Sequence, residues 1–187
     1  MMISGFTRID TVTVPDWYMS VVCVSSEGEG LDPAEIRETL EKDKDSIDYV
    51  AISSDDDPLA FKDLYGTIKG FKPRGMKVLL ITDGRDPAIL DDLVGAGYVH
   101  AADILVGESL TEEQLECIGI LTYNGCKYTI TVDAASHTED SISSIAAKAD
   151  GCSMFIFRQD RKKPLSREEM KPLMKAAKAC TWNIKTI

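Results

Sequence analysis

The chain alternates short apolar runs with longer stretches in which apolar residues recur every three or four positions. The short runs are rich in β-branched residues and are typical of strands, whereas the longer stretches predict amphipathic helices. Most of the short runs are near-continuously apolar, which favours parallel strands covered on both faces. The predicted strands are Met19–Ser25, Asp48–Ser53, Lys77–Thr82, Ala101–Val106, Lys127–Val132 and Cys152–Phe157.

Helix starts are recognisable between these strands. Asp32-Pro33 and Asp86-Pro87 each place a capping aspartate before a proline at the first helical position. Thr111–Gln114 and Ser166–Glu169 have the form of a capping box. Two further helices are expected, over 58–70 and over 138–148.

Six consecutive βα units predict an α/β fold, either a partial (βα)6 parallel barrel of the TIM type, open or closed, or a doubly wound sheet. Residues 1–18 are expected to form an extended or hairpin lead-in to the first strand, and 182–187 a final short strand. No linker or change in composition divides the chain, so residues 1–187 are expected to form a single domain.

Charge restricts the classes of partner. The 187 residues include 31 Asp and Glu against 21 Lys and Arg, a net charge of −10, which repels phosphate backbones and anionic lipids. Nucleic acid and membranes are therefore not expected partners. No apolar run approaches the roughly 18 residues that span a bilayer, and the N-terminus lacks a signal-peptide pattern, so a cytoplasmic location is expected. The five cysteines contain no C-x-x-C pair and are expected to be reduced thiols.

Several short phrases follow one another along nearly the whole chain. They are Ile3–Phe6 with Val14-Pro15-Asp16, Tyr49–Pro58, Leu80–Pro87, Gly97–Asp103, Tyr128–Asp133, His137–Asp140 and Phe155–Arg158. In this order they resemble the activating-enzyme branch of the radical S-adenosylmethionine proteins, which activates anaerobic ribonucleotide reductase or pyruvate formate-lyase. The phrase over 49–58 is similar to the V-x-I-S-G-G-E-P segment of that family, and the phrase over 80–87 to its L-x-T-N-G-x-x-P segment. The resemblance implies a radical-SAM-like barrel.

The cysteine motif of that family is missing. Family members hold a [4Fe–4S] cluster with three cysteines spaced C-x-x-x-C-x-x-C after the first barrel strand. This chain reads Val22-Cys23-Val24-Ser25-Ser26-Glu27-Gly28-Glu29-Gly30-Leu31 at that place. Cys23 is expected to be a core thiol, and no iron–sulfur cluster is expected. Aspartates also replace the glycine pair after the second strand, which disfavours S-adenosylmethionine binding through that loop.

The remaining candidates for chemistry lie just after the predicted strands, because parallel βα folds bind ligands at the carboxyl ends of their strands. The ligand-binding candidates are Ser53, Ser54, Asp55, Asp56, Asp57, Asp83 and Asp133. Their carboxylates could converge on Mg²⁺ or on a cationic ligand. Alternatively, they cap the following helices and face solvent.

Two further residues are catalytic candidates. His137 could act as an acid or base, or be an ordinary loop residue before a helix. Arg158 could clamp a carboxylate or phosphate, or form a salt bridge with Asp133. The basic run 158–164 is either an exposed loop or a docking surface for an acidic partner.

Three functions are compatible with this sequence. The first is a non-catalytic binding or regulatory subunit that acts through homodimerisation or a partner protein. The second is a small barrel enzyme that uses a divalent cation, Mg²⁺, at an acidic mouth. The third is a protein that still binds S-adenosylmethionine without cleaving it.

Overall fold

The computed structural model describes residues 1–187, which form one eight-stranded sheet with six helices. The strands are β1 (Met2–Asp10), β2 (Met19–Ser25), β3 (Tyr49–Ser54), β4 (Lys77–Thr82), β5 (Ala101–Val106), β6 (Lys127–Asp133), β7 (Met154–Arg158) and β8 (Ile184–Thr186). The helices are α1 (Pro33–Asp43), α2 (Leu64–Phe71), α3 (Pro87–Gly95), α4 (Glu112–Tyr123), α5 (Glu139–Lys148) and α6 (Arg167–Ala177). The predicted α/β class and all the predicted strands are confirmed, within two residues at each end.

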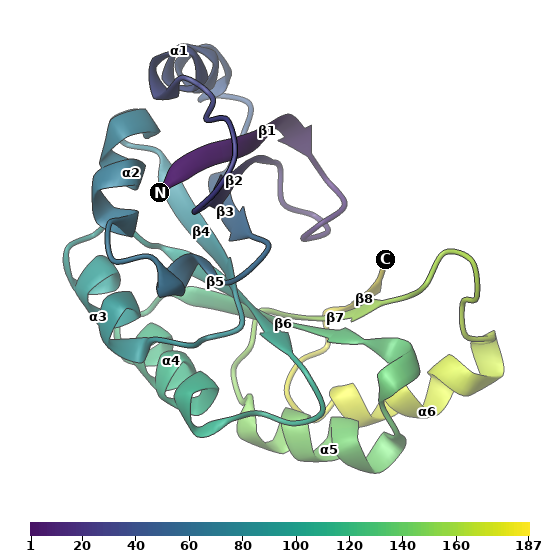
Figure 1. The fold of residues 1–187 in the computed structure, drawn as a ribbon. Coiled ribbons are helices and arrows are strands. Elements are labelled where there is room, and N and C mark those ends of the chain that lie inside the picture. The colour runs from purple at the N-terminus through teal and green to yellow at the C-terminus, as the bar shows by residue number, and fades with distance from the viewer.

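The strands lie side by side in the order of the sequence, from β1 to β8. The pair β1 and β2 is antiparallel, as expected for a hairpin lead-in, and every other pair is parallel. The helices follow one another around the convex side of the curved sheet (Figure 1). Strand β1 pairs only with β2 and β8 only with β7, so the sheet is open.

The helix starts follow the predicted capping chemistry. Asp32 and Asp86 accept main-chain hydrogen bonds at the starts of α1 and α3. Thr111 and Ser166 form capping boxes at the starts of α4 and α6. Each of these caps satisfies amide groups that a helix end would otherwise leave unpaired.

The prediction of one continuous helix over 58–70 was wrong. Pro58–Ala60 forms a single 3-10 turn, and α2 begins only at Leu64. Phe61, which ends the turn, has an extended backbone with φ −97° and ψ 112°, so the helical path is broken there. Sequence periodicity could not detect this break, because the residues on both sides pack in the same core.

Two apolar clusters cover the two faces of the sheet. The larger one lies between the sheet and the helices and contains 39 buried residues. The smaller one lines the concave face with ten buried residues, among them Val14 from the loop between β1 and β2. Trp17 of the same loop stacks on Tyr49 with 5.0 Å between ring centroids. This loop therefore plugs the concave face at the amino ends of the parallel strands.

No helix of the structure combines the length and apolar character needed to cross a membrane.

Candidate functional site

The predicted site residues all lie at one edge of the sheet. Parallel strands bring the residues that follow β3, β4, β6 and β7 to the same carboxyl edge. Ser53 and Ser54 end β3, Asp83 follows β4, Asp133 ends β6 and Arg158 ends β7. The parallel arrangement of the strands thus brings the candidates to one mouth. The contacts that they make there differ greatly.

Asp57 organises the β3 and β4 ends from a fully buried position. Its carboxylate accepts the Thr82 hydroxyl at 2.7 and 2.9 Å, and the Leu59 amide at 2.8 Å. The amides of Asp83 and Arg85 donate to the same side chain at 3.2 and 3.3 Å. Burial alone would raise the pKa of Asp57, but the hydrogen bonds from Asp83, Thr82 and the main chain together hold it below its usual value.

Asp83 lies beside Asp57 and is linked to Arg85. The Arg85 guanidinium donates to Asp83 at 3.0 Å and to Asp56 at 2.6 Å, so it bridges two of the predicted acids. Burial and the neighbouring Asp57 raise the pKa of Asp83 to about 6, although Arg85 opposes this shift. Its Oδ1 atom is buried and has no hydrogen-bond partner. A carboxyl group that titrates near neutrality therefore faces the mouth.

A depression of about 500 Å³ opens beside Asp83, with Gly84, Arg85, Leu105 and Gln114 among its lining residues. The Gln114 side-chain amide donates to the main-chain oxygens of Asp83 and Leu105, both at 2.9 Å, which ties α4 to two strand ends. Gly84 has φ +77°, and a Cβ atom there would lie 3.1 Å from Gln114 Cγ. Only glycine satisfies both constraints.

Asp103, which sequence reasoning missed, is a fully buried acid in the middle of β5. The hydroxyls of Thr129 and Thr131 donate to its Oδ1 atom at 2.6 and 2.7 Å. Its Oδ2 atom has no partner. Burial raises the pKa of Asp103, against the opposing hydrogen bonds of the two threonines and the charge of Arg158. Ala101, two residues earlier, belongs to the concave cluster, so the Asp103 side chain also lies on the concave face.

The signal that could have identified Asp103 is an ionisable residue inside an otherwise apolar strand, Ala-Ala-Asp-Ile-Leu-Val. A buried charged group is rare unless it is paired.

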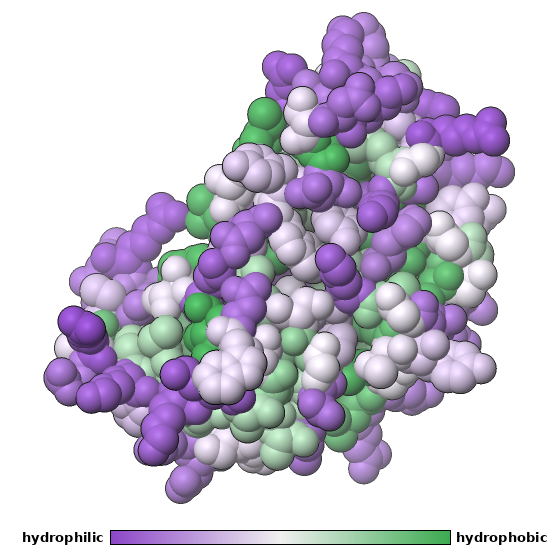
Figure 2. Space-filling view, turned by 180° about the vertical axis from the view of Figure 1, so that it is seen from behind, coloured by the Kyte–Doolittle hydropathy of each residue, from purple (hydrophilic) through white to green (hydrophobic).

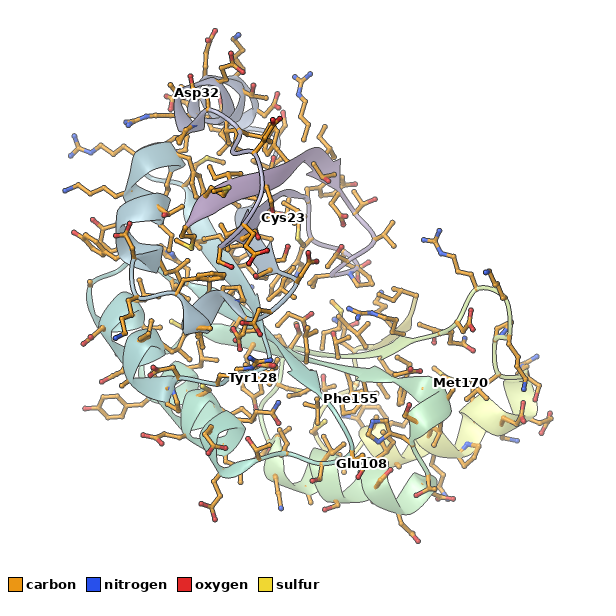
Figure 3. The ribbon with its side chains drawn as sticks, in the orientation of Figure 1. Cys23, Asp32, Glu108, Tyr128, Phe155 and Met170 are labelled. Carbon is orange, nitrogen blue, oxygen red and sulfur yellow. The ribbon has the colours of Figure 1, made fainter.

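His137 lies on the far side of the mouth, after β6. Its Nδ1 atom is 3.1 Å from the Ser141 hydroxyl, and its Nε2 atom is buried without a hydrogen-bond partner. Burial lowers the pKa of His137, while Asp133 and Glu108 oppose the shift. Glu108 lies in the loop between β5 and α4 (Figure 3). The ring is therefore neutral at physiological pH.

The other candidates lie outside the contacts of Asp57, Asp83 and Arg85. The Ser53 hydroxyl is 3.3 Å from the Cys23 thiol, and the Ser54 hydroxyl accepts the Asp56 amide at 3.3 Å. Asp55 is exposed. Asp133 caps a 3-10 turn by accepting the Ala135 amide at 3.1 Å.

Arg158 pairs in register with Asp133 across β7 and β6, but the two side chains form no ion pair. The structure therefore brings Asp56, Asp57 and Asp83 together and leaves Asp133 in its own turn.

The cysteines do not fit an iron–sulfur cluster. The loop between β2 and α1 contains no cysteine, and Cys23, labelled in Figure 3, lies within β2. Cys117 is buried in α4, and Cys152 and Cys180 lie at the opposite, amino edge of the sheet, before β7 and β8. No group of three His, Cys, Asp or Glu side chains has a geometry that could hold a metal ion.

Among comparisons with known proteins, a match comes from a solved structure. No protein family model matches the chain, and no curated protein matches its sequence. The crystal structure of Streptococcus suis SuiB bound to the precursor peptide SuiA superposes with a TM-score of 0.66 at 11% identity. The match covers 87% of this chain and 43% of the SuiB chain, so this chain spans less than half of that protein. At this identity the likeness shows that the chain shares the fold of that part of SuiB.

Proposed function

We propose that this chain is a non-catalytic binding subunit that uses a radical-SAM-like scaffold to hold a small organic cation at the carboxyl ends of β4, β5 and β6. The order of the sequence phrases supports a relation to the activating-enzyme branch. The missing cluster cysteines support the loss of reductive chemistry, since the cluster supplies the electron in that family.

One observation carries the proposal. Three buried side-chain atoms in the protein lack a hydrogen-bond partner: Asp83 Oδ1, Asp103 Oδ2 and His137 Nε2. Asp103 lies in β5, Asp83 directly follows β4, and His137 follows β6 after the short turn Ala134–Ser136, so the three belong to neighbouring strands. An unpaired buried polar atom costs roughly 1–3 kcal/mol, so a ligand that supplies the missing partner would recover this free energy. Because β4, β5 and β6 are neighbours in one sheet, this placement favours a common ligand over three independent defects.

The chemistry of these atoms defines the ligand class. Two carboxylate oxygens accept hydrogen bonds, so the ligand should carry N–H donors and a positive charge, as an ammonium or guanidinium group does. A bound cation would also hold both carboxylates in their charged forms against the effect of burial. S-adenosylmethionine carries an ammonium and a sulfonium group and falls within this class.

Thermal unfolding of the whole chain tests the proposal. Agmatine, S-adenosylmethionine and MgCl₂ are compared at millimolar concentration, and an organic cation should raise the melting temperature because it binds only the folded state. Asp103→Asn should abolish the shift, and Asp55→Asn, at an exposed acid, should retain it. If neither agmatine nor S-adenosylmethionine raises the melting temperature, the proposed ligand class is contradicted.

A rise with Mg²⁺ that is lost in Asp83→Asn would support the divalent-cation enzyme instead. A brown protein after anaerobic iron–sulfur reconstitution would contradict the non-catalytic assignment, because it would show that a cluster forms.

A further inference from the structure

The C-terminal part of the chain has the opposite charge to the rest. Residues 158–178 contain eight Lys and Arg against three Asp and Glu, a net charge of +5 in a chain whose total is −10. The remaining residues therefore carry −15. The segment comprises the loop after β7 and the whole of α6. In the view from behind, these elements lie at the lower left and present a hydrophilic surface (Figure 2).

None of these eight cations has an intramolecular ion-pair partner. The residues that form ion pairs with acids lie elsewhere, at Arg8, Lys42, Lys44, Arg85 and Lys185. The chain has ten more acids than bases, so partners are not scarce. The positive charge of α6 is thus left available to another molecule.

Four of these cations form a row along α6. Arg167, Lys171 and Lys175 are four residues apart, and Lys178 follows three residues later, a spacing that places them on one helix face. The row is about 16 Å long at 1.5 Å per residue. It borders a groove of about 570 Å³ that Met170 and Met174 also line. Met170, labelled in Figure 3, is buried beneath this face.

An exposed tryptophan extends the row. Trp182 is 84% exposed, and the Lys178 ammonium lies 5.7 Å from the centroid of its ring. Tryptophan and arginine are the residue types that most often supply binding energy at protein interfaces. Cations in a row, an apolar groove floor and an exposed indole together have the composition of a docking surface and not of a simple solvated helix face.

We propose that the α6 surface, defined as Arg167, Lys171, Met174, Lys175, Lys178 and Trp182, docks an acidic segment of a partner protein. The row suits a helix of about three turns whose carboxylates recur every four residues, with an apolar side chain against Met174 and Trp182. A nucleic acid or a membrane surface would extend beyond the 16 Å row and meet the acidic remainder of the chain, which would repel it. A short acidic segment avoids that repulsion.

A labelled model peptide tests this surface. The probe is a fluorescein-labelled 15-residue helical peptide with glutamate at every fourth position and one leucine stripe, and its partner is the full chain at low ionic strength. Fluorescence anisotropy should show binding that weakens steeply with salt, because exposed charge pairs are screened. The same peptide with glutamine in place of glutamate should not bind.

Charge-reversal variants locate the contact. Lys171→Glu with Lys175→Glu should weaken binding at least about tenfold. Lys62→Glu with Lys69→Glu makes the same change in net charge near and within α2, where both lysines are exposed, and should weaken it less than about twofold. Equal losses in the two variants would overturn the proposal, because they would reflect net charge alone. The pair Lys171→Ala with Lys175→Ala gives the same comparison should the reversed pair fail to fold.

Tryptophan emission reports the site directly. Docking should shift the emission of exposed Trp182 to shorter wavelength, and Trp182→Phe should remove the shift, since Trp17 is packed on Tyr49. Tighter binding to phosphatidylserine vesicles or to single-stranded oligothymidine than to the acidic peptide would overturn the assignment of a protein partner.

Discussion

The Thr82 hydroxyl lies 2.7 and 2.9 Å from the two carboxylate oxygens of Asp57, and neither group reaches solvent. Through this contact and three main-chain amides, Asp57 joins the turn after β3 to the end of β4. Asp57, one of the acids predicted to bind a ligand, therefore forms a structural link between the ends of two strands.

Asp57→Ala should destabilise the protein by about 3 kcal/mol, because one buried hydroxyl and three amides lose their acceptor. Urea unfolding at pH 7 measures the change. Asp55→Ala removes an exposed acid two residues away and should change stability by less than about 0.5 kcal/mol. Similar losses of stability in both variants would show that the hydrogen bonds of Asp57 do not stabilise the local structure.

Asp83 should give the protein a distinct pH dependence. Its folded-state pKa of about 6 lies above the usual 3.8, so the folded protein holds this proton more tightly than the unfolded chain does. The resulting stabilisation is complete below about pH 4 and is lost as the pH rises through about 6. Asp83→Asn should therefore be more stable than the wild type above pH 6, with the difference shrinking toward pH 4. A constant difference between pH 4 and 7 in urea unfolding would contradict this assignment.

Gly84→Ala should destabilise the protein by about 1–3 kcal/mol, because the residue has a positive φ and its new Cβ would press on Gln114. It should also weaken any ligand binding at the mouth, since Asp83 and Arg85 flank the altered turn. Gly70→Ala is the matched control. Gly70 lies inside α2 with open space around its Cα, and alanine there should stabilise by up to about 1 kcal/mol.

Cys152 and Cys180 should form a disulfide under mild oxidation, because their sulfur atoms lie 3.5 Å apart. Glutathione disulfide is the oxidant: the two thiols lose two electrons and two protons, and two glutathione thiols are released. Mass spectrometry should show a loss of two hydrogens, and the free thiol count should fall from five to three. The link should raise stability by about 3 kcal/mol. Cys180→Ser should prevent both changes, whereas persistent five-thiol titration in the wild type would contradict the prediction.

The strands and helix caps could be predicted because local chemistry decides them. Lys77–Thr82 and Ala101–Val106 are predominantly apolar runs, and both became strands with the predicted bounds. Asp86-Pro87 combines a cap and a fixed φ, and the helix begins there. The residues over 58–70 contain no comparable break signal, because the turn at Pro58–Ala60 depends on a buried carboxylate whose other partners lie on β4.

The candidate site was predicted in outline but not in its chemistry. Asp83 and His137 could be predicted because they follow strands, and parallel topology alone brings such residues to one edge of the sheet. Asp103 depends on hydroxyls 26 and 28 residues away along the chain, which no local pattern reveals. The salt bridge of Arg158 with Asp133, one of the two roles considered for Arg158, did not form, and Asp133 instead caps the turn that follows it. Register fixes which Cα atoms are neighbours, and local capping then decides where each side chain points.

The outer strands β1 and β8 each pair with a single neighbour, which makes the packing of Val14 important for the shape of the sheet. A closed ring of strands fixes its own diameter by hydrogen bonding, but here no strand pairing joins β1 to β8, and the Lys185–Asp16 ion pair links β8 to the loop between β1 and β2. Val14 is fully buried in the concave cluster, whose other members come from β2, β3, β4, β5 and β7, so it packs between the two flanks of the sheet. Val14→Ala would therefore loosen the packing at the opposite edge of the sheet from Asp83, Asp103 and His137. Each of those side chains would be left intact.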